Sequence, residues 1–356
     1  MKKVLSIVSS IALAAVLLWP VQPAAASDAE PPSLNMYLPI DIEDHWAYAE
    51  LDHFVMADLI KGYQNGDGSV SVKPEQSVTR AEFVALLVRG LGLESKASGK
   101  AFADVEPTKW YYEPIRIASS LGIVNGTSDA QFEPGKKINR GELATMIVRA
   151  FKSSIDFADV TRDLPFVDVP DYFATESIAA AYETGIVYGK TELEFQPFAS
   201  AKRAEAVVML TRALDMQASD LPEDSALFEL VKKSDTTFKD AVNAKQLDRL
   251  HELNESYSTG YQFALNYVIA NALLEMKEEG IVLNYADTKE PVLTVLHKAD
   301  RFAIVESTGG SYELTTTENG QESKETLTSD SLYLMKKMGD GSWKVYANLF
   351  DEEQQP

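Results

Sequence analysis

Apolar positions follow two different periods along the chain. Between about residues 38 and 216 they recur every three or four positions, which is typical of amphipathic helices. We expect one set of helices over residues 47–60, 111–123 and 175–186, each stopping before a glycine, and a second set starting near Arg80, Arg140 and Arg203. Beyond residue 280 the period is two, which predicts strands. The chain therefore divides into a helical part and a later part that contains a sheet.

The later part begins with helical periodicity and ends with strands. We expect helices over residues 225–250 and 256–279, behind a polar linker at 217–224. The expected strands lie at residues 281–285, 292–297, 302–307, 312–317, 331–338 and 343–349. Glycine-rich turns separate several of them, as at Gly309-Gly310 and Gly339-Asp340-Gly341. This order predicts an α+β domain over residues 225–350, with an antiparallel meander.

The helical part contains three copies of one unit, which residues at constant offsets reveal. Each copy carries an aromatic residue sixteen positions before a glycine: Trp46 and Gly62, Trp110 and Gly126, Phe173 and Gly189. Each also carries an arginine that is followed two positions later by a glutamate: Arg80 and Glu82, Arg140 and Glu142, Arg203 and Glu205. These offsets define unit 1 (residues 38–95), unit 2 (residues 100–152) and unit 3 (residues 164–216).

The two short helices of one unit cannot bury their apolar faces by themselves. The second helix of unit 1 places Phe83, Leu86 and Leu87 on one face, and the other units have apolar residues at matching positions. The units must therefore pack together around a shared core. We predict a multidomain protein, with an all-α, pseudo-threefold bundle of three helix-loop-helix units followed by the α+β domain.

Several motifs of these units resemble the S-layer homology repeat. They are His45-Trp46-Ala47 and Val78-Thr79-Arg80-Ala81-Glu82 in unit 1, Phe102-Ala103-Asp104-Val105 and Ile138-Asn139-Arg140-Gly141-Glu142 in unit 2, and, fitting less well, Phe166-Val167-Asp168-Val169-Pro170 and Lys202-Arg203-Ala204-Glu205 in unit 3. The resemblance implies anchoring to the wall of a Gram-positive-type bacterium through a secondary cell wall polysaccharide, which often bears pyruvate ketals. It also implies ligand contacts at the start of the second helix and in grooves between units.

The start of the second helix suits an anion on physical grounds. Thr79 and Glu82 have the spacing of a capping box, and Arg80 follows in the first turn, where the positive end of the helix dipole favours a negative group. A guanidinium there could bind the carboxylate of a pyruvate ketal, and Trp46 or Trp110 could stack on the apolar face of the sugar. The alternative is a structural role, because capping boxes start ordinary helices and aromatic residues are most often buried.

The motifs give ten candidate glycan-binding residues. They are Asp41, Trp46, Gly62, Arg80, Asp104, Trp110, Gly126, Arg140, Lys202 and Arg203. Units 1 and 2 have both the tryptophan and a good helix N-cap residue, whereas unit 3 has Phe173 and, at the N-cap position, Lys202, which cannot accept a hydrogen bond. We therefore expect units 1 and 2 to bind ligand and unit 3 mainly to complete the core.

Residues 1–26 have the pattern of a signal peptide. Lys2 and Lys3 precede an apolar run over residues 4–18, and Ala24-Ala25-Ala26 offers small residues for cleavage. We expect an exported protein of the cell wall or cell surface, without a membrane span once the leader is removed. The chain has no cysteine, which excludes disulfides and cysteine-ligated metals. With 33 basic against 54 acidic residues, a nucleic-acid partner is not expected.

No metal, cofactor or catalytic site is expected. Residues 65–76 resemble a calcium loop, but Val70 stands where that loop needs glycine and Gln76 where it needs glutamate. The stretch His251-Glu252-Leu253-Asn254-Glu255 lacks the second histidine of a zinc-protease helix. The chain also shows neither a nucleophile elbow nor a phosphate-binding loop, so we expect a protein without enzymatic activity.

The C-terminal pattern resembles, in outline only, the nuclear-transport-factor-two-like group, whose cone-shaped α+β fold holds a small molecule or mediates association. Three functions stay open. We favour a wall anchor that displays the C-terminal domain. The rivals are an enzyme or small-ligand module delivered to the surface, for which Asp287 or Glu306 would have to face an apolar cavity, and a structural subunit of a surface layer. The partner of the C-terminal domain is not apparent from the sequence.

Overall fold

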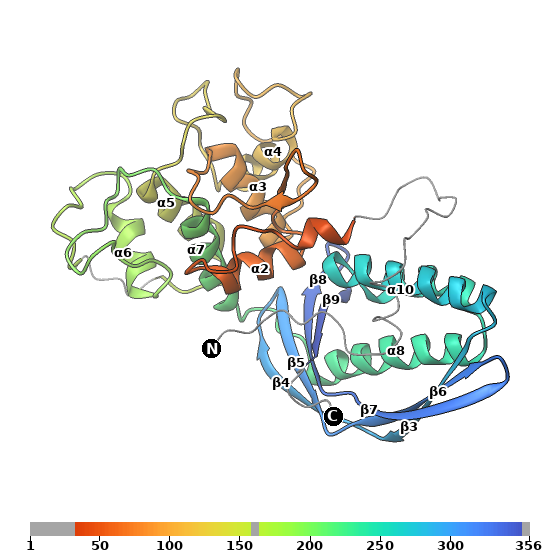
Figure 1. Ribbon diagram of the computed structural model, residues 1–356. Coiled ribbons are helices and arrows are strands. Elements are labelled where there is room, and N and C mark those ends of the chain that lie inside the picture. The colour runs from red at the N-terminus through yellow and green to blue at the C-terminus, as the bar shows by residue number, and fades with distance from the viewer. Residues whose placement is uncertain (1–32, 158–163, 351–356) are drawn as a thin grey trace.

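The computed structural model describes residues 33–157 and 164–350 and shows two regions that lie against each other (Figure 1). The helical region comes first along the chain, and the C-terminal domain that follows has long helices over a curved antiparallel sheet. This confirms the predicted order of a helical part followed by an α+β part. The predicted signal peptide, residues 1–26, lies outside the described residues.

Each unit supplies two α-helices to the helical region. The first helices are α2 (Tyr48–Met56), α4 (Tyr112–Ser120) and α6 (Thr175–Glu183), and the second helices are α3 (Arg80–Leu91), α5 (Arg140–Phe151) and α7 (Arg203–Asp215). A short 3-10 helix, η1 (Leu34–Tyr37), precedes α2. A small hairpin of β1 (Tyr63–Gln64) and β2 (Val70–Ser71) lies between α2 and α3.

The first helices end earlier than the apolar pattern predicts. Helix α2 stops at Met56 rather than near residue 60, because Asp58 adopts a left-handed conformation with a φ of 58°. The two residues that follow Asp58 turn back, and both of their N–H groups donate to the carbonyl of Phe54. In α4 and α6 the left-handed residue is a glycine, Gly122 or Gly185. Apolar residues beyond the turn still enter the core, so periodicity overestimates the helix length.

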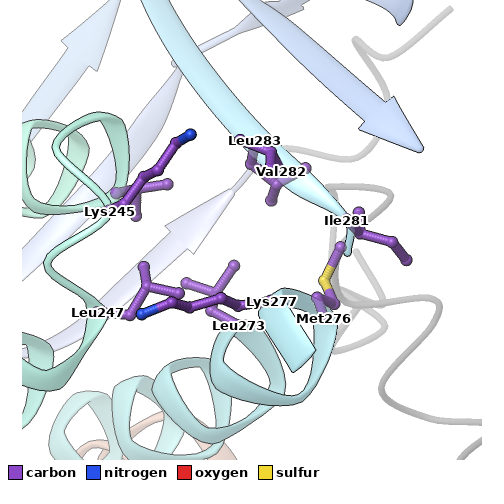
Figure 2. A pocket seen from close by; sticks show the side chains of 9 residues that line it. Lys245, Leu247, Leu273, Met276, Lys277, Ile281, Val282 and Leu283 are labelled. Atoms are coloured by element: carbon purple, nitrogen blue, oxygen red, sulfur yellow. The ribbon is translucent and has the colours of Figure 1, made fainter. Parts of the chain in front are cut away.

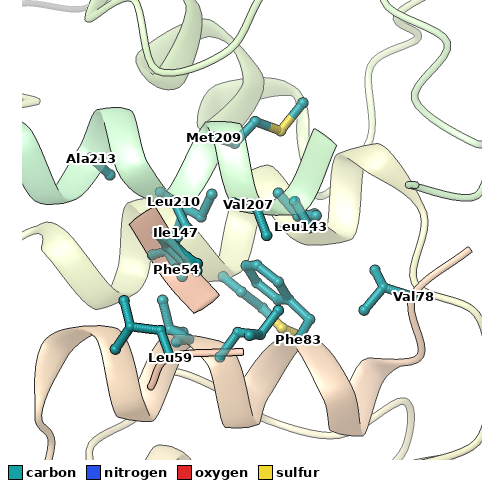
Figure 3. Packing of buried hydrophobic residues seen from close by; sticks show 14 of the residues in the cluster. Phe54, Leu59, Val78, Phe83, Leu143, Ile147, Val207, Met209, Leu210 and Ala213 are labelled. Atoms are coloured by element: carbon teal, nitrogen blue, oxygen red, sulfur yellow. The ribbon is translucent and has the colours of Figure 1, made fainter. Parts of the chain in front are cut away.

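The helices of different units pack against one another in a cyclic order. Helix α4 packs on α3, α6 packs on α5 and α2 packs on α7, so each first helix lies on the second helix of another unit. Figure 3 shows the shared core, where the second helices contribute Phe83, Leu143 and Val207, all fully buried, together with Phe54 from α2. The units therefore bury their apolar faces jointly, as their short helices require.

Backbone hydrogen bonds between units follow a cycle as well. The N–H of Val78 donates to the carbonyl of Ala201 at 3.0 Å, that of Ala201 to Ile138 at 2.9 Å, and that of Ile138 back to Val78 at 3.1 Å. These three residues are fully buried and lie just before the second helices of their units. Contacts of one kind thus recur between each pair of units.

The C-terminal domain starts with helices and continues with strands. The helices are α8 (Asp224–Asn243), η2 (Leu247–Arg249), α9 (Leu250–Tyr257) and α10 (Gly260–Glu278). The strands are β3 (Val282–Lys289), β4 (Val292–Lys298), β5 (Phe302–Thr308), β6 (Ser311–Glu318), β7 (Gln321–Thr328), β8 (Ser331–Lys337) and β9 (Trp343–Phe350). They form two antiparallel sheets with the orders β3-β6-β7 and β4-β5-β8-β9.

The two sheets are halves of one bent meander. Only two residues separate β3 from β4, β5 from β6 and β7 from β8, so three long strands cross from one half to the other. The register of β3 against β6 shifts between Asp287 and Lys289, and Lys289 then pairs with Ser311 at the bend. At the bend Gly310 has no room for a Cβ atom, which would meet Ser329 and Pro291. Glycine is therefore needed where the strands fold most tightly.

Helix α8 covers both halves of the meander. Leu227 and Val231 in its first half pack with the sheet of β5, β8 and β9, and Ala241 and Val242 in its second half pack with the sheet of β3, β6 and β7. Figure 1 shows α8 and α10 as two long helices of the domain, of which α8 contacts β3 and α10 contacts β9. The domain thus has two small cores joined by one helix.

Two elements of this domain differ from the sequence prediction. A helix is expected up to residue 250, but α8 ends at Asn243 because Lys245 is left-handed, with a φ of 60°, and η2 and α9 follow in a new direction. Strand β7 is not predicted at all. Its residues are polar and mostly exposed, so they carry no apolar alternation.

Candidate functional site

The arginines at the starts of the second helices are buried. Arg80, Arg140 and Arg203 are only 3%, 2% and 3% exposed. Each forms an ion pair with a glutamate of another unit: Arg80 with Glu142 at 3.0 Å, Arg140 with Glu205 at 3.0 Å, and Arg203 with Glu82 at 3.1 Å. The pairs run from unit 1 to unit 2, from unit 2 to unit 3 and from unit 3 back to unit 1. We call these six residues the arginine ring.

Carbonyl and aromatic groups complete the surroundings of each arginine. Arg80 Nε donates to the carbonyl of Phe132 at 2.9 Å, and the guanidinium lies 4.8 Å from the centre of the Phe132 ring. Arg140 repeats this arrangement with Phe195, at 2.8 Å and 4.6 Å. Burial lowers the pKa of Arg80 and of Arg140, and the paired glutamates oppose that shift. In both arginines, Nε and one terminal nitrogen of the guanidinium thus bind protein groups.

Each ring glutamate uses one carboxylate oxygen for a backbone N–H and the other for an arginine of another unit. The arginine-binding oxygen of Glu82 also accepts from the Tyr63 hydroxyl at 3.0 Å, and that of Glu205 also pairs with Lys190. Oε2 of Glu82 accepts the N–H of the N-cap residue Thr79 at 2.7 Å, while Oε1 pairs with Arg203. The equivalent backbone bonds join Glu142 to Asn139 at 3.0 Å and Glu205 to Lys202 at 2.8 Å. Burial alone would raise the pKa of Glu82, but the hydrogen bonds from Thr79 and the charge of Arg203 outweigh it and lower that pKa. The arginine-x-glutamate spacing therefore makes a helix cap and an inter-unit bridge together.

The first N–H groups of the second helices are occupied too. In α3, Arg80 N donates to the carbonyl of Lys136 at 2.9 Å and Ala81 N to that of Pro134 at 3.1 Å. The starts of α5 and α7 make the equivalent bonds to loops of units 3 and 1. The anion at each helix start is consequently a protein carboxylate. The structure places Arg80, Arg140 and Arg203 in inter-unit contacts, each paired with a glutamate of another unit.

Asp41 and Asp104 hold the loop that precedes the second helix. Both carboxylate oxygens of Asp41 accept backbone N–H groups of this loop at 2.8 Å, and those of Asp104 do the same at 2.9 and 2.7 Å. One donor in each loop, Lys73 or Glu133, is left-handed, with a φ of 58° or 60°. A residue with a side chain is strained there by roughly 1 kcal/mol or more. The two aspartates thus stabilise a strained loop, with each carboxylate oxygen accepting one backbone N–H.

Gly62 and Gly126 allow close approach of the backbone to neighbouring side chains. A Cβ atom at Gly62 would collide with the side chain of Val70. A Cβ atom at Gly126, where φ is 83°, would meet the ring of Phe102. These two candidates therefore have a structural reason to be glycine, whether or not a ligand lies nearby.

The aromatic residues at the equivalent positions of the three units are exposed. Trp46, Trp110 and Phe173 are 64%, 63% and 64% exposed, although large aromatic side chains are usually buried. Lys202 is half-buried at the start of α7. The pKa of Glu75 is lowered mainly by a hydrogen bond with His45, the neighbour of Trp46. The charge of Lys202 adds to this lowering. Of the candidates, Trp46 and Trp110 are therefore exposed, and Asp41, Asp104 and Lys202 are half-buried.

Unit 3 differs from the others beside its exposed aromatic residue. The Tyr172 ring lies 5.0 Å from the Phe173 ring and 5.2 Å from the Phe198 ring, and Phe198 is 63% exposed. The Tyr172 hydroxyl reaches α5 and lies where a Cβ atom of Gly141 would be. Unit 3 thus presents an apolar aromatic cluster next to unit 2, where unit 1 presents His45 and Glu75.

Asp235 and Asp287 of the C-terminal domain are paired with one lysine. Lys239 on α8 binds Asp287 on β3 at 2.6 Å and Asp235 on α8 at 2.7 Å, and its ammonium lies 4.9 Å from the centre of the Tyr312 ring. The rings of Tyr285 and Tyr312 lie 5.7 Å apart and fill the adjoining space. Asp287, which an enzyme would need to face an apolar cavity, instead ends in an ion pair.

A half-open hollow lies at one end of the C-terminal domain (Figure 2). Its floor is apolar and includes Leu247, Leu273 and Leu283, and the side chains of Lys245 and Lys277 lie at its sides. It is enclosed by the end of α10, the start of β3 and the segment after α8.

The residues that the structure describes contain neither a metal-binding cluster nor a membrane-spanning helix. Among residues 33–157 and 164–350, no group of three or more histidine and acidic residues is placed to hold a metal ion. The calcium-like loop forms the β1–β2 hairpin, where Asn65 and Asp67 hydrogen-bond to Ser69. In the same ranges, no helix has both the length and the apolar character to cross a bilayer.

Residues 101–144 and 165–207 match the family model of the S-layer homology domain. The two matched segments lie within units 2 and 3 and include the aromatic residue and the arginine-x-glutamate pair of each. The resemblance that the motifs indicate is confirmed for these two segments.

The match to each of three curated relatives covers little more than a third of that relative at most, at 21%, 36% and 28% of its length. The "Cellulosome-anchoring protein" of Acetivibrio thermocellus is 29% identical over 165 residues, which cover 45% of this chain and 36% of that protein. The "S-layer protein" of Bacillus thuringiensis subsp. finitimus is 25% identical over 246 residues, which cover 68% and 28%. An "Endoglucanase" of Bacillus sp. (strain KSM-635) is 27% identical over 201 residues, which cover 55% and 21%.

Among solved structures, the intermembrane space region of the chloroplast protein ARC6 matches 36% of this chain and all of that chain, with a TM-score of 0.30 and 19% identity. At that score the likeness does not establish a common fold. The S-layer homology segments and the surface-layer relatives confirm the predicted location of an exported cell-surface protein. In these segments the chain is similar to the proteins of the S-layer homology family.

Proposed function

We propose that the helical region is a pseudo-threefold bundle of three S-layer homology repeats that anchors the protein to the cell wall by binding an acidic wall polysaccharide. The observation that carries this proposal is the exposure of Trp46, Trp110 and Phe173 at equivalent positions. An aromatic ring has an apolar face that can stack on the C–H face of a sugar, and water leaves both surfaces when they meet. The similarity to a cellulosome-anchoring protein and to an S-layer protein also supports a role in anchoring at the cell surface.

The acidic part of the ligand would meet exposed lysines rather than the ring arginines. Lys136 and Lys137 lie on the loop whose backbone pairs with the start of α3, and half of the Lys136 side chain is exposed. Lys202 lies at the start of α7, near His45 and Glu75. In this proposal the arginine ring fixes the distances between the aromatic positions, and the lysines supply the charge contacts.

Pull-down with purified sacculi tests the proposal. Mature protein is mixed with sacculi before and after extraction of the non-peptidoglycan polymers, and we expect retention to fall when those polymers are removed. Trp46→Ala and Trp110→Ala should each weaken retention about tenfold, since one aromatic contact is worth roughly 1–1.5 kcal/mol. Phe350→Ala is the matched control, because Phe350 is an exposed aromatic residue of the C-terminal domain.

Two results would count against this function. Retention that is unchanged by polymer extraction would remove the polysaccharide as the receptor. Retention that depends on the polymer but is equal in the two tryptophan variants, the Phe350 control and the unmodified protein would keep the anchor and discard the aromatic site.

For the C-terminal domain we propose a displayed, non-catalytic role. The support is the pairing of Asp287 with Lys239, together with the tyrosine rings that fill the interior beside them. Binding of a small ligand is a second candidate, and the hollow beside Lys245 and Lys277 favours it. Chemical-shift changes of Leu273 and Leu283 methyl groups on addition of a short-chain carboxylate would support that candidate, and unchanged spectra would remove it.

A further inference from the structure

The end of α2 differs from the ends of α4 and α6. In α4 and α6 the residue after the C-cap is Gly122 or Gly185, and a glycine adopts the left-handed conformation there without strain. In α2 the equivalent residue is Asp58, with a φ of 58°. A residue with a Cβ atom is strained in this conformation, and its negative charge lies at the negative end of the helix dipole. The first helix of unit 1 thus ends on an unfavourable residue.

Groups of the C-terminal domain occupy this helix end. The ammonium of Lys336, on β8, donates to the carbonyl of Ala57, the C-cap residue of α2, and Lys336 is only 8% exposed. Gly260, the first residue of α10, lies against the carbonyl of Met56 so closely that a Cβ atom would not fit. A cation and the positive start of another helix therefore meet the negative end of α2.

Asp58 is part of the same contact. Its carboxylate accepts a hydrogen bond from the Tyr37 hydroxyl at 2.9 Å. Burial lowers the pKa of Lys336 to about 8, and the charge of Asp58 is the largest opposing influence, while Arg301 adds to the lowering. A lysine is kept in this buried place because it faces a carbonyl and a carboxylate. The residue that strains α2 also attracts the group that caps it.

Aromatic contacts extend the junction along α2. The Tyr346 hydroxyl, on β9, lies 3.0 Å from Nδ1 of His53, and the ring of Phe302 lies 4.8 Å from the His53 ring. Tyr346 and Phe302 belong to the hydrophobic cluster that contains Phe54 of α2. The C-terminal domain thus shares a hydrophobic core with unit 1 and is packed against it. Figure 1 shows α4 and α6 on other sides of the helical region.

We propose that the C-terminal domain is an intramolecular brace of unit 1, which supplies through Lys336 and the start of α10 the helix end that units 2 and 3 form with their own glycines. The proposal gives this domain a role beyond display, and it does not depend on which glycan the helical region binds. It also explains why Asp58 is tolerated at a position that favours glycine.

Hydrogen exchange of the full chain, read by mass spectrometry, tests the brace. Lys336→Met removes the cation but keeps most of the apolar stem. We expect exchange in α2 to accelerate about tenfold or more, because a buried carbonyl loses a charged donor. Helices α4 and α6 serve as internal references and should not change. Lys344→Met is the matched control, because the Lys344 ammonium donates to the carbonyl of Glu255 within the C-terminal domain.

A second variant locates the effect at the helix end. In an Asp58→Gly background α2 regains the type of end that α4 and α6 have, so Lys336→Met should accelerate its exchange clearly less than in the natural chain. Equal exchange of α2 in Lys336→Met and the unmodified protein would overturn the brace, as would equal acceleration of α2, α4 and α6. An undiminished effect in the Asp58→Gly background would overturn the assignment to this helix end.

Discussion

The helical region and the C-terminal domain hold their buried charges in different ways. In the helical region each buried arginine has a glutamate of another unit as its partner, and the pairs close into a ring. In the C-terminal domain Lys239 lies between two acids, Asp235 and Asp287, and Lys336 leaves its own domain to meet α2. Repetition of one unit yields one contact several times, whereas the unrepeated domain forms each contact once.

This comparison separates two meanings of a repeated motif. A motif can recur because a ligand site recurs or because an interface recurs. The arginine-x-glutamate pairs are buried between units and belong to the interface, whereas the aromatic positions are exposed and are free to meet a ligand. The predictions that follow test this division, first inside the ring and the sheet, then at an unpaired acid, and last on the surface.

The largest effect is expected inside the ring. Arg140→Ala leaves the buried Glu205 with Lys190 as its remaining cation and removes the donor from the carbonyls of Phe195 and Tyr188, so it should lower the free energy of unfolding by about 3 kcal/mol. Urea unfolding followed by circular dichroism measures this loss. Arg149→Ala, a half-buried arginine of the same helix, is the control and should cost about 1 kcal/mol or less. Equal losses of unfolding free energy in the two variants would show that the arginine ring does not stabilise the fold more than an ordinary half-buried arginine does.

A smaller effect is expected at the bend of the meander. Gly310→Ala places a methyl group against Ser329 and Pro291 and should cost about 1–3 kcal/mol. Gly66→Ala is the control, since nothing lies within 4 Å of a Cβ atom there. The same urea titration compares them. A Gly310→Ala protein as stable as the Gly66→Ala protein would mean that the bend tolerates a side chain.

Asp52, on α2, gives a pH-dependent prediction. Burial raises its pKa from the usual 3.8 to about 7, so the fold disfavours the ionised carboxylate. That cost appears as pH rises above 3.8 and is complete above about 7. Asp52→Asn should therefore raise the melting temperature at pH 8 by about 2 °C, with no gain at pH 4. Differential scanning calorimetry at both pH values decides, and a gain that is larger at pH 4 would refute the sign.

The smallest effect on stability is expected at the exposed aromatic positions. Trp46→Ala and Trp110→Ala should change the free energy of unfolding by no more than about 0.5 kcal/mol, because both side chains already face water. Phe54→Ala, in the core, should cost about 3–5 kcal/mol in the same assay. Strong destabilisation by the tryptophan variants would assign these residues to the fold and weaken the comparison.

The helical units are visible in the sequence because their residues recur at constant offsets. The ring partners are not, since Arg80 and Glu142 are 62 positions apart and Arg140 and Glu205 are 65 positions apart. The local spacing correctly predicts that the glutamates cap their helices. It does not predict that the second carboxylate oxygen of each glutamate binds an arginine of another unit. The helix cap alone accounts for the position of each glutamate in the sequence, so its distant arginine partner is not predicted.

In the C-terminal domain, apolar alternation reveals the strands that face a core. It does not reveal β7, whose exposed polar residues are held by pairing with β6. Nor does it show that β3 and β4 belong to one long strand, because the interruption at Glu290-Pro291 has the composition of a turn. The sequence does not predict the contact of Lys336 with Ala57 either, because these residues are 279 positions apart and meet only in the folded protein.

The return of Arg203 to Glu82 has a consequence for how such a region can change in evolution. An open array of repeats grows at its end, where an added copy touches only the last one. Here the final unit already meets the first, so an inserted copy would break one existing link and a deleted copy would break two. Duplication or loss is therefore expected to involve the whole closed set, not a single member.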